Sequence, residues 1–160
     1  LYEGGIRVPL MIRWPGVTKA GSECKEIVSS QDFYATLAEA AGHRTADLPK
    51  HDGQNLGPLL NDPKQRLARR TLYWHYPHYY PRMTPASAIR DGDWKLIHYY
   101  EDDRLELFNL ANDLSETSNL ATALPARTQA LQAKLNTWRQ ETNAKAPTAN
   151  PDWKPAGKKK

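Results

Sequence analysis

Three short segments with strand character follow one another closely in the second half of the chain, and this spacing constrains the fold more than any other feature. The segments 86–90, 94–100 and 105–110 are separated by links of only three and four residues, the first of which contains Asp91-Gly92. Links this short connect antiparallel neighbours, because a parallel connection needs a crossover of about a dozen residues or more. The sequence therefore predicts an antiparallel sheet.

The middle segment, 94–100, has apolar side chains on both faces of the predicted sheet. Leu96 and Ile97 point to opposite faces because side chains alternate along a strand, so neither face is wholly polar. One face is therefore expected to meet a helix or a second domain. Residues 125–142 can supply such a helix, since Pro125 is typical of a first helical position. The apolar stripe of this helix is formed by Leu131, Leu135 and Trp138.

The aromatic segment 71–76 predicts a fourth strand. Pro77 and Pro81 follow it, and proline cannot donate a hydrogen bond to a central ladder. An irregular, exposed loop is therefore expected after residue 76.

The first 62 residues have a different character. Alternating apolar residues predict a strand over 8–14, which Pro9 places toward a sheet edge. Ser29 and Asp32 have capping-box spacing before a helix predicted over 32–41, which Gly42 ends. At most a short helical turn is expected over 56–60.

Two adjacent glycines, Gly4 and Gly5, precede the predicted strand of the first 62 residues. They favour a turn that needs a positive φ or the close approach of another group.

Charge and composition exclude several classes of protein. The formal net charge is +4, but three of these charges belong to Lys158, Lys159 and Lys160, and charges of both signs are interleaved elsewhere. This pattern argues against nucleic-acid binding, which concentrates basic residues on one face. No apolar run reaches the roughly 18 residues of a membrane span, so no membrane partner is expected.

No complete catalytic constellation is recognisable in the chain. Cys24 has no second cysteine and no histidine at ligand spacing, so a disulfide, a zinc site and a thiol nucleophile are all disfavoured. His75 and His78 flank the end of the predicted 71–76 strand, where they could contact an anionic or hydroxylated ligand or simply form half-buried edges of an aromatic cluster. His98 is expected to be a satisfied sheet histidine.

Several segments, in order, resemble the C-terminal third of the type I, formylglycine-dependent sulfatases of the alkaline-phosphatase-like superfamily, of arylsulfatase or polysaccharide sulfatase type. The first segment is the most specific, and the resemblance covers nearly the whole chain. The segments are 1–10 (LYEGGIRVPL), 13–16 (RWPG), 29–37 (SSQDFYATL), 73–79 (YWHYPHY), 86–97 (ASAIRDGDWKLI) and 106–110 (ELFNL).

The resemblance implies an α+β fold, in which the end of a large α/β sheet domain precedes a small four-stranded antiparallel sheet packed by a C-terminal helix. The implied boundaries are 1–62 for the edge of the large domain, 63–143 for the small subdomain and 144–160 for an extended tail. Because their strand end and loop resemble the family's cleft side, His75, His78 and Tyr79 are expected to bind substrate away from the sulfate. No catalytic residue and no metal ligand is expected in this chain.

The resemblance also implies chemistry that these residues do not supply. Such enzymes use a formylglycine made within a Cys/Ser-x-Pro-x-Arg motif and a calcium ion, yet the chain lacks that motif and Cys24 precedes Lys25, Glu26 and Ile27. The expected partners are the N-terminal catalytic portion of the same protein and a sulfated carbohydrate or aryl substrate. A first residue that is not Met, lying inside a motif, predicts a piece of a longer protein that is inactive alone. The family further implies a periplasmic or extracellular location.

Two other functions remain open. The chain could be a free-standing carbohydrate or protein binding module that kept this architecture without catalysis. Alternatively, its parent could be a phosphodiesterase or phosphonate hydrolase of the same superfamily.

Overall fold

The computed structural model separates into two compact units. The first consists of Leu1–Ile6 and the chain from Leu72 onward, and the second is Arg7–Thr71. The residues that the structure describes are 1–69, 71–81, 83–148 and 150–152.

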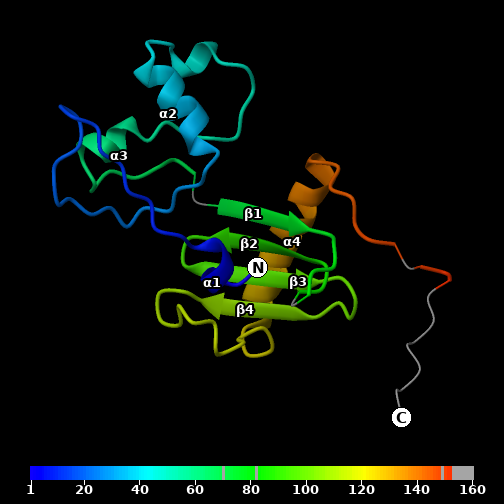
Figure 1. Ribbon diagram of the computed structural model, residues 1–160. Helices are drawn as coiled ribbons and strands as arrows, with labels where there is room; N and C mark the ends of the chain where they lie inside the picture. The colour runs from blue at the N-terminus through cyan, green and yellow to red at the C-terminus, as the bar shows by residue number, and fades with distance from the viewer. Residues whose placement is uncertain (70, 82, 149, 153–160) are drawn as a thin grey trace. The chain divides into compact units, whose positions relative to one another are not determined.

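The first unit is built on a four-stranded sheet in the order β1-β2-β3-β4, so each strand lies beside its neighbour in sequence (Figure 1). Strands β2 and β3 pair antiparallel with Ala88 opposite Ile97, and β3 and β4 pair in the same way. The predicted antiparallel sheet is therefore confirmed. The strands are β1 (Thr71–Tyr76), β2 (Ala86–Asp91), β3 (Trp94–Tyr99) and β4 (Leu105–Asn109).

Helix α4 (Pro125–Glu141) packs across one face of this sheet, as the apolar stripe predicted (Figure 1). The ring of Trp138 stacks on Tyr73 of β1 with their centroids 4.8 Å apart. Burial of this apolar surface is what holds a helix that has few apolar residues of its own against the sheet. The buried residues of this layer are Ile89, Leu96, Leu107, Leu131 and Leu135.

The opposite face of the sheet has a second apolar layer. The first residues of the chain, including the four-residue helix α1 (Glu3–Ile6), lie on this side, and Leu1 packs against the layer. Both faces of β3 are thus covered, which explains why apolar residues alternate onto both of them. The buried residues of this layer are Ala86, Ala88, Ile97, Tyr99, Phe108 and Leu110.

The second unit contains α2 (Asp32–Ala40), the 3-10 turn η1 (Thr45–Asp47) and α3 (Gly57–Asn61). Helix α2 begins at the expected residue, and Gly42 follows it with a φ of +91°, a backbone conformation that favours glycine. The helical turn predicted at 56–60 is confirmed as α3. A small core of Leu56, Leu59 and Leu67 holds this unit together.

Two local expectations were wrong. Residues 8–14 form no strand, because a strand needs a hydrogen-bonded neighbour and none of the described residues pairs with this segment. Gly4 and Gly5 lie in α1 without positive φ, and a Cβ on either would meet nothing within 4 Å in this chain. Of the tail predicted over 144–160, residues 149 and 153–160 lie outside the described residues.

Candidate functional site

His75 belongs to a connected polar network on the α4 side of the sheet. Its Nδ1 lies 2.7 Å from the hydroxyl of Ser87 on β2, and that hydroxyl lies 2.8 Å from the hydroxyl of Tyr100. Its Nε2 donates to the backbone carbonyl of Lys145, 3.0 Å away, beyond the end of α4. Both ring nitrogens of His75 are therefore engaged, and the histidine ties the segment after α4 to the sheet.

A second histidine, His98 on β3, is satisfied in a comparable way. Its Nε2 donates to Asp103 over 2.5 Å, and its Nδ1 accepts from the guanidinium of Arg139, 2.7 Å away. Because Arg139 donates to Nδ1, that nitrogen carries no proton of its own. The expectation of a satisfied sheet histidine is confirmed.

Arg139 links α4 to this polar network on the sheet. Its guanidinium lies 5.0 Å from the centre of the Tyr100 ring. Burial lowers the pKa of Arg139 below its usual value, although Tyr100 and Asp103 act in the opposite direction. Arg139 nevertheless stays charged at neutral pH, since an arginine starts from a very high value.

His78 and Tyr79 lie on the exposed loop after β1. The Tyr79 hydroxyl donates to Glu101 over 2.8 Å, and this hydrogen bond raises the pKa of Tyr79. The His78 ring meets the ring of Tyr76 edge-on, with centroids 5.6 Å apart. Tyr80 pairs its backbone with Met83 through two hydrogen bonds of 3.0 Å. The loop is thus tethered and presents exposed aromatic side chains.

Of the three residues predicted to bind substrate, His78 and Tyr79 share one loop and are accessible. His75 is half-buried and points into the network beneath α4. The three side chains do not converge on one pocket among those described. The bonds of His75 therefore support the end of β1 and the segment after α4.

The sequence reasoning missed a buried charge cluster on the other face of the sheet. Lys95 of β3 is fully buried, and its ammonium group lies 3.0 Å from Glu3 and 2.8 Å from Glu116. Arg90 of β2 adds a further ion pair to Glu3 at 3.1 Å. Two cations and two carboxylates thus fix the LYEGG segment to the sheet. The one sequence feature that could have indicated this cluster is the position of Lys95 within the largely apolar strand β3.

Glu116 reaches this charge cluster from a strained backbone. Its φ is +55°, an uncommon value for a residue with a side chain. One of its carboxylate oxygens accepts from the backbone N–H of Glu3 at 2.5 Å, and the other pairs with Lys95. These interactions offset the local strain.

A hydroxyl network lies beside the charge cluster. Tyr2 donates to Glu106 over 2.6 Å, and the hydroxyl of Tyr99 lies 3.0 Å from that of Tyr2. Burial, and then the hydrogen bond with Tyr2, raise the pKa of Tyr99 far above its usual value. Arg104 pairs with Glu106 and covers the Tyr99 ring at 3.9 Å.

In the second unit, a buried polar cluster is centred on Asp32. Asp32 is fully buried and receives two hydrogen bonds from Arg69, at 2.7 and 2.8 Å, and others from the backbone N–H groups of Ser29 and Gln54. Burial alone would raise the pKa of Asp32, but these hydrogen bonds and the Arg69 charge outweigh it and lower the pKa. The Asp32 half of the predicted capping box, its bond to the Ser29 N–H, is thus present, and the carboxylate also holds the 53–69 segment.

The described donor groups do not gather into a metal site. Within the described ranges, no group of three or more His, Cys, Asp or Glu side chains could hold a metal ion. The buried carboxylates of the clusters above pair instead with lysine or arginine, as those of Glu3, Glu116 and Asp32 do. The residues present do not fit a calcium site, and no helix in the described part of the chain is long and apolar enough to cross a bilayer.

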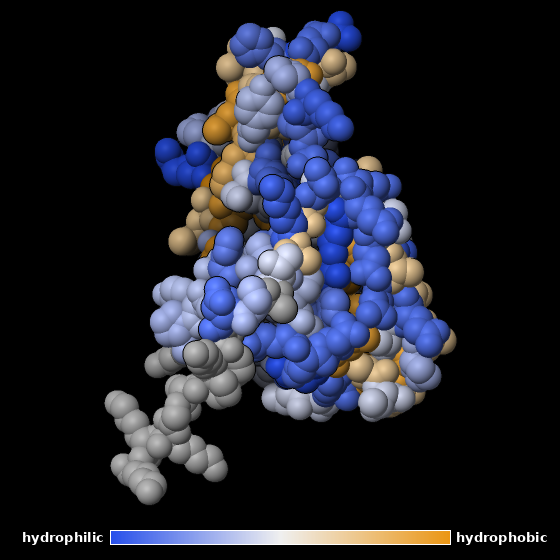
Figure 2. Space-filling model, turned by 90° about the vertical axis from the view of Figure 1, so that its right-hand side faces the viewer, coloured by the Kyte–Doolittle hydropathy of each residue, from blue (hydrophilic) through white to orange (hydrophobic). Residues whose placement is uncertain are grey.

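Apolar side chains remain at the surface of the second unit. Figure 2 shows hydrophobic residues at the surface among hydrophilic ones. Met11 is 91% exposed and Val8 77%, which is unusual for side chains of this kind. The other large exposed apolar residues of this unit are Leu10, Ile12, Phe33, Tyr34 and Leu37.

Comparison with known proteins places this architecture in a family. The family model described as N-sulphoglucosamine sulphohydrolase, C-terminal, matches residues 1–145. The chain therefore belongs to this family of sulfatase C-terminal regions, as its sequence resemblance indicated.

Individual relatives agree with the family match. A sulfatase of Formosa agariphila is 38% identical over 158 residues, covering 89% of this chain and 29% of that protein. An N-acetylglucosamine-6-O-sulfatase of Bacteroides thetaiotaomicron is 34% identical, covering 75% of this chain and 22% of that protein. Human arylsulfatase K is 31% identical, and the match covers 85% of this chain and 26% of that protein. The chain thus spans less than a third of the length of these relatives.

Solved structures share the fold. A structure determined in complex with its substrate D-glucosamine-2-N,6-O-disulfate matches with a TM-score of 0.68 and 28% identity, covering 84% of this chain and 28% of that one. A phosphonate monoester hydrolase of Silicibacter pomeroyi matches with a TM-score of 0.61 and 19% identity. The match covers 81% of this chain and 28% of that one. At 19% identity, the likeness to the phosphonate monoester hydrolase shows the fold alone.

Proposed function

We propose that this chain is the C-terminal part of a sulfatase that hydrolyses sulfate esters of carbohydrate or aryl substrates. The observation that carries the proposal is the family match over residues 1–145, in a chain that spans less than a third of its relatives. In this proposal the chain supplies scaffold and part of the substrate cleft and is inactive alone.

The residues present suit a supporting role. Several buried titratable groups are held in ion pairs inside each unit, as Lys95 is by Glu3 and Asp32 is by Arg69. The sequence has no Cys/Ser-x-Pro-x-Arg motif. The formylglycine and the calcium ligands of the proposed enzyme would therefore come from its N-terminal portion.

The partner proposed for this chain is that N-terminal catalytic portion. The exposed apolar residues of the second unit, Met11 and Val8 above all, are costly to leave in water. Residues 8–14 have strand periodicity without a pairing neighbour, which suits a segment that adds to a sheet elsewhere. Burial of both features against the N-terminal portion would complete the large domain.

Substrate contact is proposed for the loop after β1. His78 and Tyr79 are accessible there, and imidazole and phenol groups suit hydroxyls and anions on a sugar. His75 would hold the strand end beneath the loop through Ser87 and Lys145. The similarity to an N-acetylglucosamine-6-O-sulfatase and to a structure in complex with D-glucosamine-2-N,6-O-disulfate supports a sulfated carbohydrate as the substrate. The proposed location is periplasmic or extracellular.

The second candidate is a phosphonate or phosphodiester hydrolase of the same superfamily. Its support is the shared fold of the phosphonate monoester hydrolase, at 19% identity. A binding module without catalysis is the third candidate, for a chain that folds and binds sugar without the N-terminal portion.

One experiment separates these candidates. The full-length gene product and this chain alone are assayed for release of sulfate from N-acetylglucosamine-6-sulfate and from an aryl sulfate, and for hydrolysis of a phosphonate ester. The proposal expects sulfate release by the full-length protein and none by the chain alone. Turnover by the chain alone, or hydrolysis of the phosphonate ester without sulfate release, would contradict it.

A further inference from the structure

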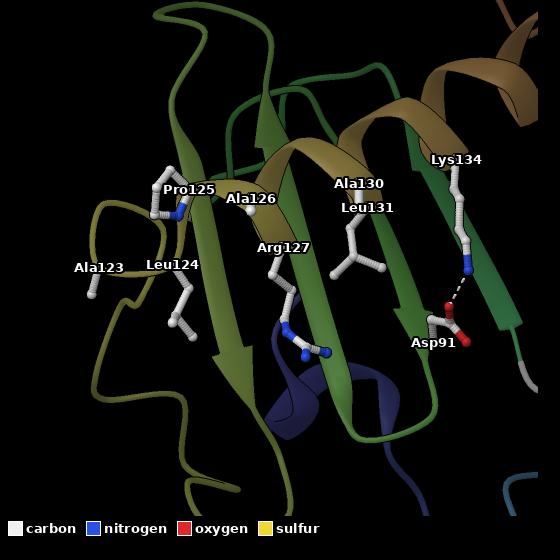
Figure 3. Close-up of a pocket in the computed structure, with 9 residues that line it drawn as sticks. All are labelled: Asp91, Ala123, Leu124, Pro125, Ala126, Arg127, Ala130, Leu131 and Lys134. Atoms are coloured by element: carbon white, nitrogen blue, oxygen red, sulfur yellow. Dashed lines mark hydrogen bonds and ion pairs between the residues drawn. The ribbon is translucent and has the colours of Figure 1, made fainter.

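A hollow of about 630 Å³ lies at the N-terminal half of α4, between the helix and the end of β2 (Figure 3). We call it the α4 pocket. It lies within the first unit and contains none of His75, His78 and Tyr79. Its lining residues are Asp91, Ala123, Leu124, Pro125, Ala126, Arg127, Ala130, Leu131 and Lys134.

Most of the lining is apolar and small. Leu124 and Leu131 supply branched side chains, and Ala126 and Ala130 leave room beside the helix (Figure 3). Of the lining residues only Leu131 is buried, and Leu124 is 38% exposed, so the α4 pocket is an open hollow on the surface rather than an enclosed cavity. An apolar surface of this kind suits the C–H face of a sugar ring better than a fully hydrated ion.

Two cations complete the lining. The Arg127 guanidinium lies 4.2 Å from the centre of the Trp94 ring, which restricts its position, and among the described residues it forms no ion pair. The Lys134 ammonium group lies 2.5 Å from Asp91 (Figure 3). The lining side chains therefore carry a net charge of +1, from two cations and one carboxylate.

The beginning of α4 adds to this positive potential. The helix runs for 17 residues, its first turn contains no acidic residue, and Leu124 gives no side-chain cap. The N-terminus of such a helix carries a partial positive charge and unpaired backbone N–H groups. Arg127 lies within that first turn, so the guanidinium and the helix terminus would act on the same anionic group.

We propose that the α4 pocket binds a sulfated saccharide, with a sulfate group at Arg127 and the start of α4 and with the sugar ring against Leu124 and Ala130. The preference for an anion rests on the lining, whereas the choice of sulfate as that anion rests on the proposed function. Asp91 ends β2, and the His78 loop precedes that strand, so the two sites lie at opposite ends of the sheet. An oligosaccharide substrate would thus have a second anchoring point.

The test follows amide hydrogen exchange in the full-length protein, which reports binding locally and without any need for turnover. The probe is a sulfated glucosamine disaccharide, compared with its unsulfated form and with inorganic sulfate. We expect the sulfated disaccharide to slow exchange in peptides covering 123–131, and Arg127→Gln with Lys134→Gln to weaken this effect about tenfold in apparent affinity. A matched double variant, Arg44→Gln with Lys50→Gln, removes the same charge elsewhere and should retain it.

Two results would overturn the proposal. One is equal protection in the wild type and the Arg127/Lys134 variant, which would place the ligand elsewhere. The other is equal protection by inorganic sulfate or by the unsulfated disaccharide, which would reduce the pocket to a plain anion site or a plain sugar site. Failure of the proposed function would appear separately, as absence of sulfate release from a protein that still shows the protection.

Discussion

The ammonium group of Lys95 lies 3.0 Å from a carboxylate oxygen of Glu3, a residue 92 positions earlier in the chain, and both side chains are buried. A charge taken out of water is strongly unfavourable unless it is paired. This ion pair therefore makes the docking of the LYEGG segment and the formation of the sheet mutually dependent.

The first prediction removes that charge. Lys95→Met leaves the Glu3 and Glu116 carboxylates buried without their shared cation, and we expect a loss of about 3 to 5 kcal/mol in the free energy of unfolding. Urea denaturation followed by tryptophan fluorescence measures it. Lys134→Met is the control, because Lys134 pairs with Asp91 at the surface, where such pairs contribute about 1 kcal/mol or less. Equal losses in the two variants would contradict the role of the cluster.

The second prediction concerns acid stability. The pKa of Asp32 is lowered in the folded chain, so the unfolded state binds a proton more readily. Asp32 therefore contributes stability that is fully present above the unfolded value of about 3.9 and is lost as the pH falls toward the folded value. Asp32→Asn should lower stability at pH 7 and flatten the decline between pH 5 and pH 2. Thermal unfolding at a series of pH values measures both, and an unchanged acid slope would be evidence against this assignment.

The third prediction concerns alkaline stability. The pKa of Tyr99 is raised in the folded state, chiefly by burial, so above about pH 10 the unfolded chain loses its proton first. Stability should fall as the pH rises through this range, and Tyr99→Phe should make the fall shallower. Absorbance at 295 nm should show one tyrosine fewer ionising together with unfolding. Tyr34→Phe, at a half-exposed position in the second unit, provides the comparison.

Much of the first unit follows from local sequence. Short links and two-residue alternation predict β2, β3 and β4, and the apolar stripe that ends in Trp138 predicts α4. Both patterns are informative because the residues that form them are buried against one another in one core. The strand expected at 8–14 is absent because none of the described residues pairs with this segment, and alternating apolar residues alone do not supply a hydrogen-bonded neighbour.

The polar clusters were largely beyond sequence reasoning. Arg69 meets Asp32 across 37 residues and Lys95 meets Glu3 across 92, and such pairings depend on the tertiary fold rather than on spacing. For the candidate site, the sequence identified the loop after β1 from its prolines and aromatic residues. It could not show that both ring nitrogens of His75 are engaged, because this depends on the position of Ser87 and on the segment after α4.

The fourth prediction separates substrate contact from support in the full-length enzyme. His78→Ala and Tyr79→Phe should each raise KM for a sulfated carbohydrate about tenfold. Each should leave kcat for a small aryl sulfate nearly unchanged. The reason is that a contact made equally in the ground and transition states changes binding alone. His75→Gln should instead lower the unfolding temperature, since it disturbs the bonds to Ser87 and Lys145. Tyr80→Phe, two-thirds exposed on the same loop, is the matched control. If the His78 and Tyr79 variants keep the wild-type KM while Tyr80→Phe raises it, the contact belongs to Tyr80 and the assignment of His78 and Tyr79 is wrong.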